Sequence, residues 1–187
     1  MTFFWILFSC LLLQRVLELI AANKNEKWMK KHGAIEFGRE HYGLMVAMHV
    51  AFLSSLILEV YFFKQDLHPL WPFFLTLFIG LQGMRFWVIR TLGKYWNTKI
   101  LVIPRGKLVK KGPYKWIKHP NYLIVTLELF TIPFIFQAYL TLVLFFVLNQ
   151  IILSIRIPLE EQVLMEWADY EAKFERQARF FPIRSKK

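Results

Sequence analysis

Long apolar blocks run through most of this chain, and they limit its possible folds more than any other feature. A helix needs about 20 residues to cross a bilayer. Apolar blocks that reach or approach this length lie at 3–22, 43–63, 70–90 and 122–155. Hydrophobic residues make up 56% of the 187 residues and aromatic residues 18%, which is too apolar for a soluble domain of this size. We therefore expect an all-α integral membrane protein.

The last block, 122–155, is too long for one simple helix. Pro133 and Gln137 near its middle predict a tight hairpin of two helices, which brings the expected number of transmembrane helices to about five. Beyond the block, from Pro158, apolar residues recur three or four apart and predict an amphipathic C-terminal helix. These residues are Leu164, Trp167, Tyr170 and Phe174.

Lys and Arg residues cluster in three polar segments. Most of them lie in the loop expected at 23–42, in the basic segment at 91–118 and in the tail after Pro158. The turn after the second block has only Lys64, and the hairpin tip has neither Lys nor Arg. By the positive-inside rule this pattern predicts the N-terminus outside and the C-terminus inside. The net charge of +11 then reflects loops that face an anionic leaflet, so we expect membrane lipid, and no nucleic acid, as a partner.

The segment 112–122 is the most informative part of the chain, because it places Gly, Pro, aromatic and basic residues where a helix enters lipid. Gly112-Pro113-Tyr114 predicts a turn. His119 precedes a proline, and a residue before proline avoids the helical region, so an extended conformation is expected for His119. Irregular backbone at membrane depth is tolerated only where it is buried in protein or lines a polar cavity. A binding site and a solvated interfacial loop with aromatic-belt residues both remain open.

A second polar group lies at the far end of the fourth block. Arg156 and Glu160 are four residues apart and share a helix face, and Glu161 adds an adjacent carboxylate. Pro158 between them is expected to offset or restart the helix. A cation beside two carboxylates can hold a zwitterion, because carboxylates suit an ammonium or ribose hydroxyls and arginine suits an anionic oxygen. An interfacial salt bridge is the alternative.

Ionisable residues also lie in or near the apolar blocks. Arg15 and Glu18, three residues apart, can simply neutralise each other. The others are His49, Glu59, Arg85 and Glu128. Charges inside a membrane are costly and indicate functional sites, although snorkelling to the interface explains those near the block ends.

Several chemistries are not expected for this chain. The single cysteine, Cys10, lies in the first apolar block, which speaks against a disulfide framework and against cysteine chemistry. The chain has no Gly-rich dinucleotide fingerprint and no phosphate-binding loop. Its five histidines show no close pairing of the kind that a metal site requires, so we expect no metal.

The chain resembles the isoprenylcysteine carboxyl methyltransferase family in three successive features. These are Gly112-Pro113-Tyr114 with Lys118-His119-Pro120-Asn121-Tyr122, then a hydrophobic hairpin, then Arg156 with Glu160-Glu161. Lys118 stands where the family usually has Arg. Arg179-Phe180-Phe181-Pro182 is similar to the family's C-terminal end, and the segment 33–42 is similar to its short bacterial branch. The resemblance implies a single membrane-embedded methyltransferase domain over 1–187, with a catalytic core at about 85–182.

The resemblance also implies S-adenosylmethionine as the methyl donor, bound on the cytosolic face. By position, its contacts would be Lys99, Gly106, Lys107, Leu108, Val109, Tyr114, His119, Pro120, Asn121, Tyr122 and Glu160. Arg156 would orient the acceptor oxygen of the substrate and form the catalytic pair with Glu160. Because an ionised acceptor needs no general base, the site has to position donor and acceptor and to exclude water.

The function expected from this resemblance is O-methylation of a lipophilic substrate with an acidic carboxyl or enolic hydroxyl, by a multi-pass protein of the bacterial plasma membrane. The substrate would be isoprenylcysteine-like, or a long-chain alkylpyrone supplied by a type III polyketide synthase, as for some bacterial relatives. Two alternatives stay open. One is an NADPH-dependent membrane reductase of the sterol-reductase type, which shares the His-Pro-x-Tyr motif, and the other is a non-enzymatic transporter or scaffold.

Overall fold

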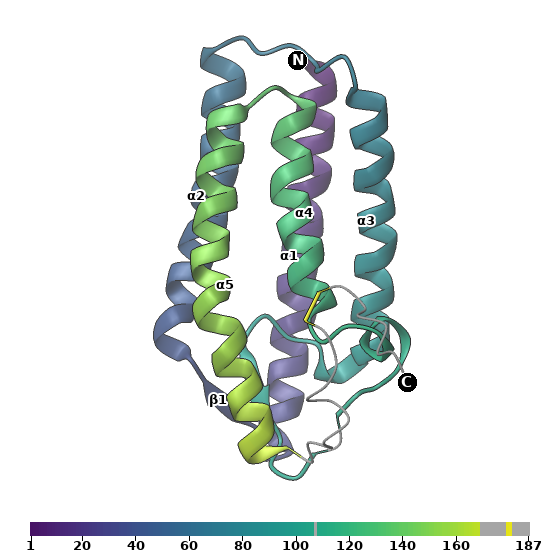
Figure 1. The fold of residues 1–187 in the computed structure, drawn as a ribbon, viewed down its shortest axis with the longest axis vertical. Coiled ribbons are helices and arrows are strands. Elements are labelled where there is room, and N and C mark those ends of the chain that lie inside the picture. The colour runs from purple at the N-terminus through teal and green to yellow at the C-terminus, as the bar shows by residue number, and fades with distance from the viewer. Residues whose placement is uncertain (107, 169–178, 181–187) are drawn as a thin grey trace, which may run out of the picture.

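Five α-helices run side by side along the long axis of the molecule (Figure 1). The computed structural model describes residues 1–106, 108–168 and 179–180. Within them the helices are α1 (Thr2–Lys31), α2 (Arg39–Phe62), α3 (Trp71–Leu92), α4 (Pro120–Ile135) and α5 (Tyr139–Trp167). The other described elements are the short 3-10 helices η1 (Gly93–Tyr95) and η2 (Gly112–Lys115) and the strands β1 (Ile35–Phe37) and β2 (Ile100–Val102). A mainly helical fold is confirmed, although the small sheet was not predicted.

Four of the helices, α1, α2, α3 and α5, are long and apolar enough to cross a membrane. The hairpin predicted within 122–155 is confirmed, since α4 and α5 are joined by the three residues 136–138, and Gln137 has a φ of +53° in this turn. With 16 residues, α4 is about 24 Å long, whereas the apolar part of a bilayer is about 30 Å thick. A fifth full span therefore stays a prediction.

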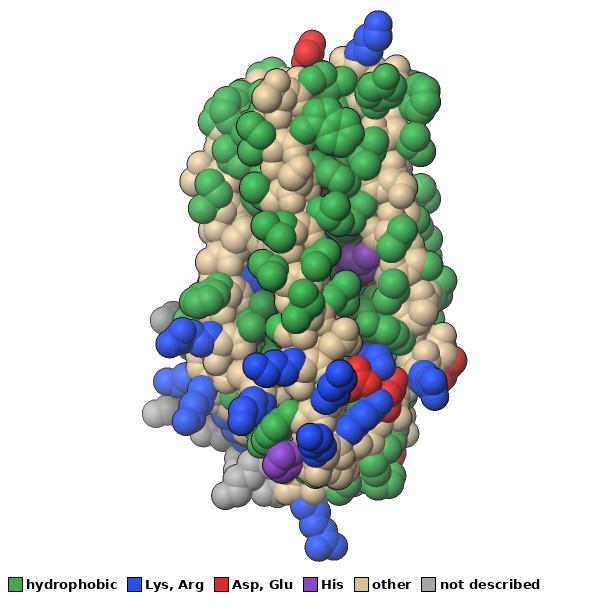
Figure 2. All heavy atoms as spheres, turned by 180° about the vertical axis from the view of Figure 1, so that it is seen from behind, with side chains coloured by type: hydrophobic (Ala, Val, Ile, Leu, Met, Phe, Trp, Pro, Cys, Tyr) green, Lys and Arg blue, Asp and Glu red, His purple; other side chains and the backbone are tan. Residues whose placement is uncertain are grey.

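The two ends of the bundle differ in their connections and in their charge. Consecutive helices run in opposite directions, so the α2–α3 and α4–α5 turns lie at one end, while β1 and β2 lie at the other, the strand-bearing end (Figure 1). Lys and Arg side chains gather towards the strand-bearing end, and apolar side chains cover much of the remaining surface (Figure 2). The charge pattern of the sequence thus corresponds to one end of the molecule, and the side of the membrane that this end faces stays a prediction.

The helices extend beyond the apolar blocks that predicted them. α1 continues past its predicted end at Ala22 to Lys31, so the prediction of a loop over 23–42 was wrong for much of its length. In the added turns, Lys30 pairs with Glu26 at 2.6 Å between Nζ and Oε1. An apolar block marks where lipid ends rather than where a helix ends, because polar residues with such pairs also form helix in water.

Pro158 does not divide the last helix. α5 runs from Tyr139 to Trp167 with Pro158 inside it, so the expected restart at this proline, and with it a separate C-terminal amphipathic helix that begins there, was wrong. A proline removes one backbone hydrogen bond from a helix, and the buried neighbours Ile157 and Val163 hold the helix on both sides of it. Of the predicted stripe, Leu164 and Trp167 lie in α5, and Tyr170 and Phe174 lie outside the described residues.

The strands β1 and β2 connect the segment after α1 to the segment after α3. They pair antiparallel, with Ile35 opposite Val102. Ile100 and Val102 are buried against Val163 near the end of α5. The sheet therefore closes the strand-bearing end and places Lys99, the residue before β2, beside a cavity.

An aromatic-rich core fills the end of the bundle that carries the two short turns. Buried phenylalanines from four helices contribute to it: Phe4 and Phe8 of α1, Phe52 of α2, Phe78 of α3 and Phe145 of α5. The rings of Phe52 and Phe145 meet edge to face with 5.6 Å between their centroids. Because side chains fill this end, the space for a ligand lies towards the strand-bearing end.

Glu59 of α2 is a buried carboxylate that caps a neighbouring helix. Its Oε1 accepts from the backbone N–H of Leu140 at 3.0 Å, and its Oε2 accepts from that of Thr141 at 2.7 Å. These N–H groups belong to the first turn of α5, where no intrahelical acceptor exists. The residue before α5 is Ala138, which cannot cap the helix itself. Glu59 thus supplies from another helix what a cap residue usually supplies locally.

Replacement of Glu59 by leucine is expected to lower the free energy of unfolding by about 1–3 kcal/mol, because two backbone donors lose their acceptor. Glu59→Gln should recover part of the loss, since its amide oxygen still accepts one bond. Thermal unfolding in detergent, followed by tryptophan fluorescence, measures the difference. The matched control is Glu40→Gln on the exposed start of α2. Equal stability of Glu59→Leu and the unmodified protein would contradict the capping role.

Candidate functional site

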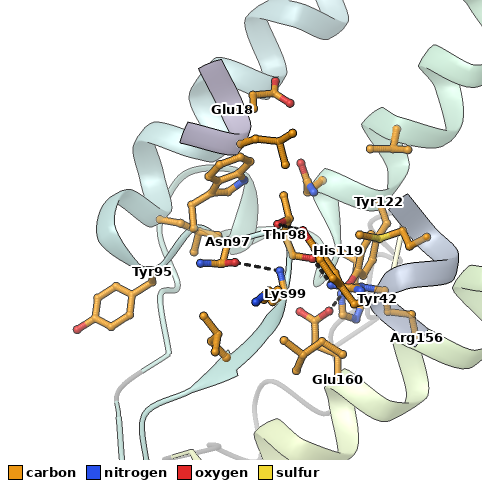
Figure 3. A pocket seen from close by; sticks show the side chains of 18 of the residues that line it. Glu18, Tyr42, Tyr95, Asn97, Thr98, Lys99, His119, Tyr122, Arg156 and Glu160 are labelled. Atoms are coloured by element: carbon orange, nitrogen blue, oxygen red, sulfur yellow. Dashed lines mark hydrogen bonds between the residues drawn. The ribbon is translucent and has the colours of Figure 1, made fainter. Parts of the chain in front are cut away.

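A cavity of about 440 Å³ lies towards the strand-bearing end of the bundle (Figure 3). All five helices and the segment 95–109 contribute to its walls. Many of the lining residues are apolar, and the charged ones lie at two levels. The first level, near the strands, holds the predicted site residues, and the second lies deeper in the bundle.

Backbone geometry explains the glycine and the second proline of the motif. Gly112 has a φ of +54°, and a Cβ on it would lie 2.5 Å from Thr91 Oγ1, so only glycine fits against the end of α3. His119 (φ −122°, ψ 58°) is the N-cap residue of α4, and Pro120 is the first residue of that helix, where a missing N–H costs nothing. The predicted turn at 112–114 is confirmed. His119 avoids the helical region as expected, but the prediction of an extended conformation was wrong, because its ψ of 58° serves the N-cap position of α4.

Tyr122 lies between the two residues predicted to be catalytic (Figure 3). Its hydroxyl donates to the Glu160 carboxylate and accepts from Arg156 Nε at 2.9 Å. Arg156 Nη2 donates to the backbone carbonyl of Thr98. These bonds hold Arg156, which is 6% exposed, in one orientation. Described residues engage two of its five guanidinium N–H groups, which leaves the others for a ligand.

The two adjacent carboxylates face different surroundings. Glu160 lines the cavity, whereas Glu161 accepts from His119 Nε2 at 3.1 Å and from Arg179 Nη2 at 2.7 Å. Consecutive residues of a helix are turned by about 100° because one turn takes 3.6 residues. Of these two carboxylates, only Glu160 therefore faces the cavity. Glu161 instead holds His119 and Arg179, and its hydrogen bond raises the pKa of the Arg179 guanidinium.

Lys99 lines the cavity, but its ammonium is paired with two carboxylates. Its Nζ lies 2.9 Å from Glu26 Oε1, at the end of α1, and 3.4 Å from Glu36 Oε1, in β1. The hydrogen bond to Glu26 raises the pKa of Lys99, and the hydrogen bond from Lys30 lowers the pKa of Glu36. Lys99 therefore ties α1 and β1 to the wall of the cavity, and its charge is shared with these partners.

Two buried polar atoms on the cavity wall have no partner among the described residues. They are the indole Nε1 of Trp96 and the amide Oδ1 of Asn121. Buried polar groups are nearly always hydrogen-bonded in folded proteins, so this donor and this acceptor point to a bound molecule. Tyr114 adds a hydroxyl to the wall. Its pKa is raised by burial and by the nearby charge of Glu160, which keeps the hydroxyl protonated.

Most of the predicted cofactor contacts come together at this cavity. Those on its wall are Lys99, Gly106, Leu108, Val109, Tyr114, His119, Asn121, Tyr122 and Glu160. Pro120 is instead fully buried in the first turn of α4, and Lys107 lies outside the described residues. The role of these residues towards a cofactor stays a prediction.

The wall residues that sequence reasoning missed include Tyr42, Tyr95, Trp96, Asn97 and Thr98. The Tyr42 hydroxyl lies 3.2 Å from Thr98 Oγ1, so the two residues support each other beside Arg156. Tyr42 had a signal, because it belongs to the segment similar to the bacterial branch. Thr98 had none, because it holds Arg156 through a backbone carbonyl, and every residue carries one.

Four charged residues from three helices form an ion network deeper in the bundle. Glu128 of α4 accepts from Arg85 Nε at 3.0 Å, from Arg85 Nη2, and from Arg15 Nη2 at 2.6 Å. Glu18 accepts from Arg15 Nη1 at 2.7 Å and from Arg85 Nη1 at 3.2 Å. Arg85 is 3% exposed and Glu128 is 2% exposed, so snorkelling does not explain them. The predicted pairing of Arg15 with Glu18 is confirmed, within a larger network.

The fold and the site together define the class of this protein. It is a helical membrane protein with a polar pocket near one end of its bundle.

Residues 74–166 match the isoprenylcysteine carboxyl methyltransferase (ICMT) family. The chain is 46% identical to the uncharacterized protein YpbQ of Bacillus subtilis over 165 residues, which cover 88% of the chain and 98% of that protein. It is 29% identical to an uncharacterized protein of Haemophilus influenzae over 165 residues, or 88% and 96% of the two chains. The chain therefore belongs to the isoprenylcysteine carboxyl methyltransferase family, as its motifs predicted. No solved structure matches it significantly.

Proposed function

We propose that this protein is an S-adenosylmethionine-dependent O-methyltransferase whose substrate is lipophilic and carries an acidic carboxyl or enolic hydroxyl. The observation that carries the proposal is the hydrogen-bonded group of Glu160, Tyr122 and Arg156. It combines a carboxylate, a hydroxyl and a guanidinium beside a cavity with many apolar wall residues. Membership of the family supports a methyltransferase that works in a membrane.

The residues near the strands fit the polar groups of S-adenosylmethionine. Its ammonium and ribose hydroxyls suit the Glu160 carboxylate, and its adenine suits the unpartnered Trp96 Nε1 and Asn121 Oδ1. The stacked rings of His119 and Tyr122, with 5.4 Å between centroids, add a flat surface. When bound, the cofactor supplies an electrophilic methyl group on a sulfonium. We assign these residues to cofactor binding and expect Lys99 to act through its ion pairs.

Arg156 is the residue that we assign to the substrate. Hydrogen bonds to Tyr122 and Thr98 hold its side chain, so the orientation of its remaining N–H groups is fixed. A guanidinium binds one oxygen of a carboxylate or enolate and leaves another electron pair free to attack. Since the acceptor is already ionised, no base has to remove a proton, and the chain contributes by positioning and by excluding water.

The apolar part of the cavity suits a lipid tail. Its walls on α1 and α2 include Leu12, Val16, Val46 and Val50, each of which is an exposed residue. From these exposed wall residues we infer an opening between the two helices. We propose that the substrate arrives through it from the bilayer, while the cofactor arrives from the strand-bearing end.

We place the protein in the bacterial plasma membrane as a multi-pass protein, with the N-terminus outside and the strand-bearing end in the cytosol. The Lys and Arg side chains gathered towards that end support this orientation. The bacterial relatives support the location. A type III polyketide synthase that supplies an alkylpyrone is the proposed partner.

The deciding experiment incubates membranes that contain the protein with methyl-labelled S-adenosylmethionine and a lipid extract, and identifies the product by mass spectrometry. We expect the label in a lipophilic ester or enol ether. If no lipid or small molecule carries the label, the methyltransferase proposal is refuted. Binding of NADPH, and not of S-adenosylhomocysteine, would favour the reductase instead.

Glu160→Gln is expected to weaken the binding of S-adenosylhomocysteine by roughly 10- to 100-fold, the loss of one or more charge-assisted hydrogen bonds. Calorimetry in detergent measures the affinity. Glu166→Gln is the matched control, because Glu166 is an exposed residue of the same helix. Unchanged affinity in Glu160→Gln, with an intact fold, would remove Glu160 from the cofactor site and favour a transporter or scaffold.

A further inference from the structure

The deep part of the cavity is polar, although a hydrocarbon tail alone would need only apolar walls. Arg15, Glu18 and Arg85 of the ion network line it, and His49 of α2 lines it as well. Apolar wall residues lie on both sides of His49 in α2, Val46 before it and Val50 after it. The polar groups therefore interrupt an apolar channel rather than end it.

The ion network is balanced in charge but does not use all its hydrogen bonds. Two arginines and two glutamates cancel each other. Arg15 is the accessible member, with 25% of its side chain exposed against 4% for Arg85. Described residues engage one N–H on each of its two terminal nitrogens. A guanidinium carries five N–H groups, so Arg15 can donate further bonds into the cavity.

His49 supplies an acceptor at the same depth. Its Nδ1 lies 2.8 Å from the Met45 carbonyl, so Nδ1 carries the proton and Nε2 keeps a lone pair. Among the described residues, none makes a hydrogen bond to this Nε2. His49 is close enough to Arg15 and Arg85 to interact electrostatically with both. A donor and an acceptor are thus offered together within the membrane.

We propose that this deep part of the cavity binds an uncharged oxygen, a hydroxyl or a keto group, carried part-way along the tail of the substrate. A hydroxyl can donate to His49 Nε2 and accept from Arg15, whereas a plain methylene chain would leave both groups without a partner. A charged group is excluded from this part of the cavity, because the charges of the ion network already cancel and an added charge would stay uncompensated inside the membrane. This inference rests on the proposed function and narrows its substrate class.

The helix rise sets the position of this oxygen along the tail. Tyr122, beside the predicted acceptor site, and Glu128, in the ion network, are six residues apart on α4, or about 9 Å along the axis. The chain can continue past the network, because Leu12 lies one turn beyond Arg15 on α1 and still lines the cavity. The substrate is therefore an acidic head, a short apolar stretch, an oxygen, and a further apolar tail.

The test uses 4-hydroxy-6-alkyl-2-pyrones of one chain length, one unsubstituted and the others carrying a hydroxyl at successive carbons. Their affinities are measured in lipid nanodiscs saturated with S-adenosylhomocysteine. The unmodified protein should bind one hydroxylated member about five- to tenfold more tightly than the plain chain, the gain from one good hydrogen bond. His49→Phe should abolish this preference, and His49→Gln, which keeps an acceptor, should retain part of it.

His41→Phe is the matched control, because His41 lies on the same helix with 42% of its side chain exposed. The preference of this control should equal that of the unmodified protein. An equal affinity for all pyrones, an absence of pyrone binding, or a preference that survives in His49→Phe overturns the inference.

Methyl transfer from labelled cofactor, measured on the same pyrones, separates the two proposals. If methyl groups are transferred but no hydroxylated pyrone binds more tightly than the plain one, only the polar subsite is refuted. If one hydroxylated pyrone binds more tightly in a way that depends on His49, but no methyl group is transferred, the result supports the subsite and counts against the methyltransferase.

Discussion

Replacement of Arg156 by methionine is expected to lower kcat/KM for methyl transfer by about 100- to 1,000-fold, the usual cost of losing a donor aimed at a reacting oxygen. The affinity for S-adenosylhomocysteine should stay within about threefold, because Arg156 is assigned to the acceptor and not to the cofactor. Steady-state kinetics with labelled cofactor and calorimetry measure the two quantities.

Two variants sharpen this prediction. Arg156→Lys keeps the charge but loses the planar fork that bonds to Tyr122 and Thr98. It should therefore recover little of the activity. Arg90→Met is the control, because Arg90 is exposed and its guanidinium lies over the Phe86 ring at the surface. A loss of cofactor affinity as large as the loss of kcat/KM would contradict the assignment of Arg156 to the substrate.

Replacement of Glu128 by leucine is expected to lower the free energy of unfolding by about 3–5 kcal/mol, the cost of breaking a buried ion pair from one side. Glu128 is 2% exposed and accepts from both Arg15 and Arg85. Its removal leaves the buried Arg85 and the partly exposed Arg15 with only Glu18 to balance them. Unfolding in a detergent and denaturant series, followed by circular dichroism, measures the loss.

The double variant Arg85→Met/Glu128→Leu tests the cause of that loss. It removes one positive and one negative charge, and the ion pair of Arg15 with Glu18 remains. Its stability should return to within about 1–2 kcal/mol of the unmodified protein, since a buried pair replaced by apolar residues is often neutral. If the double variant is as unstable as Glu128→Leu alone, packing rather than charge explains the effect.

The candidate site shows how far local sequence reasoning extends. The turn at Gly112 and the avoidance of the helical region at His119 were predicted correctly, because the backbone limits set by glycine and by the residue before proline act within a few residues. Arg156 and Glu160 were placed correctly on one helix face by helix periodicity, and in the structure both bond to Tyr122. The same periodicity explains why Glu161 faces away from the cavity, where it binds His119 and Arg179.

Other parts of the site had no local signal. The acceptor for Arg156 Nη2 is the Thr98 carbonyl, 58 residues earlier in the chain. Trp96 became a candidate only because the fold buries its indole Nε1 without a partner among the described residues. Glu59 was predicted only as one of several ionisable residues in or near the apolar blocks that indicate functional sites. The packing of α2 beside α5 showed that it caps α5, with its acceptor bond to Leu140 spanning 81 residues.

The sequence by itself determined that the chain forms apolar helices with basic segments at one end and that it carries the motifs of its family. Hydropathy, charge and turn chemistry are properties of short segments, so they can be read without the fold. The tertiary structure alone decided which charges from different helices meet. Arg15 and Glu128 are 113 residues apart, and α1 has to pack beside α4 before their charges meet. The ion network and the polar lining of the deep part of the cavity follow from that packing.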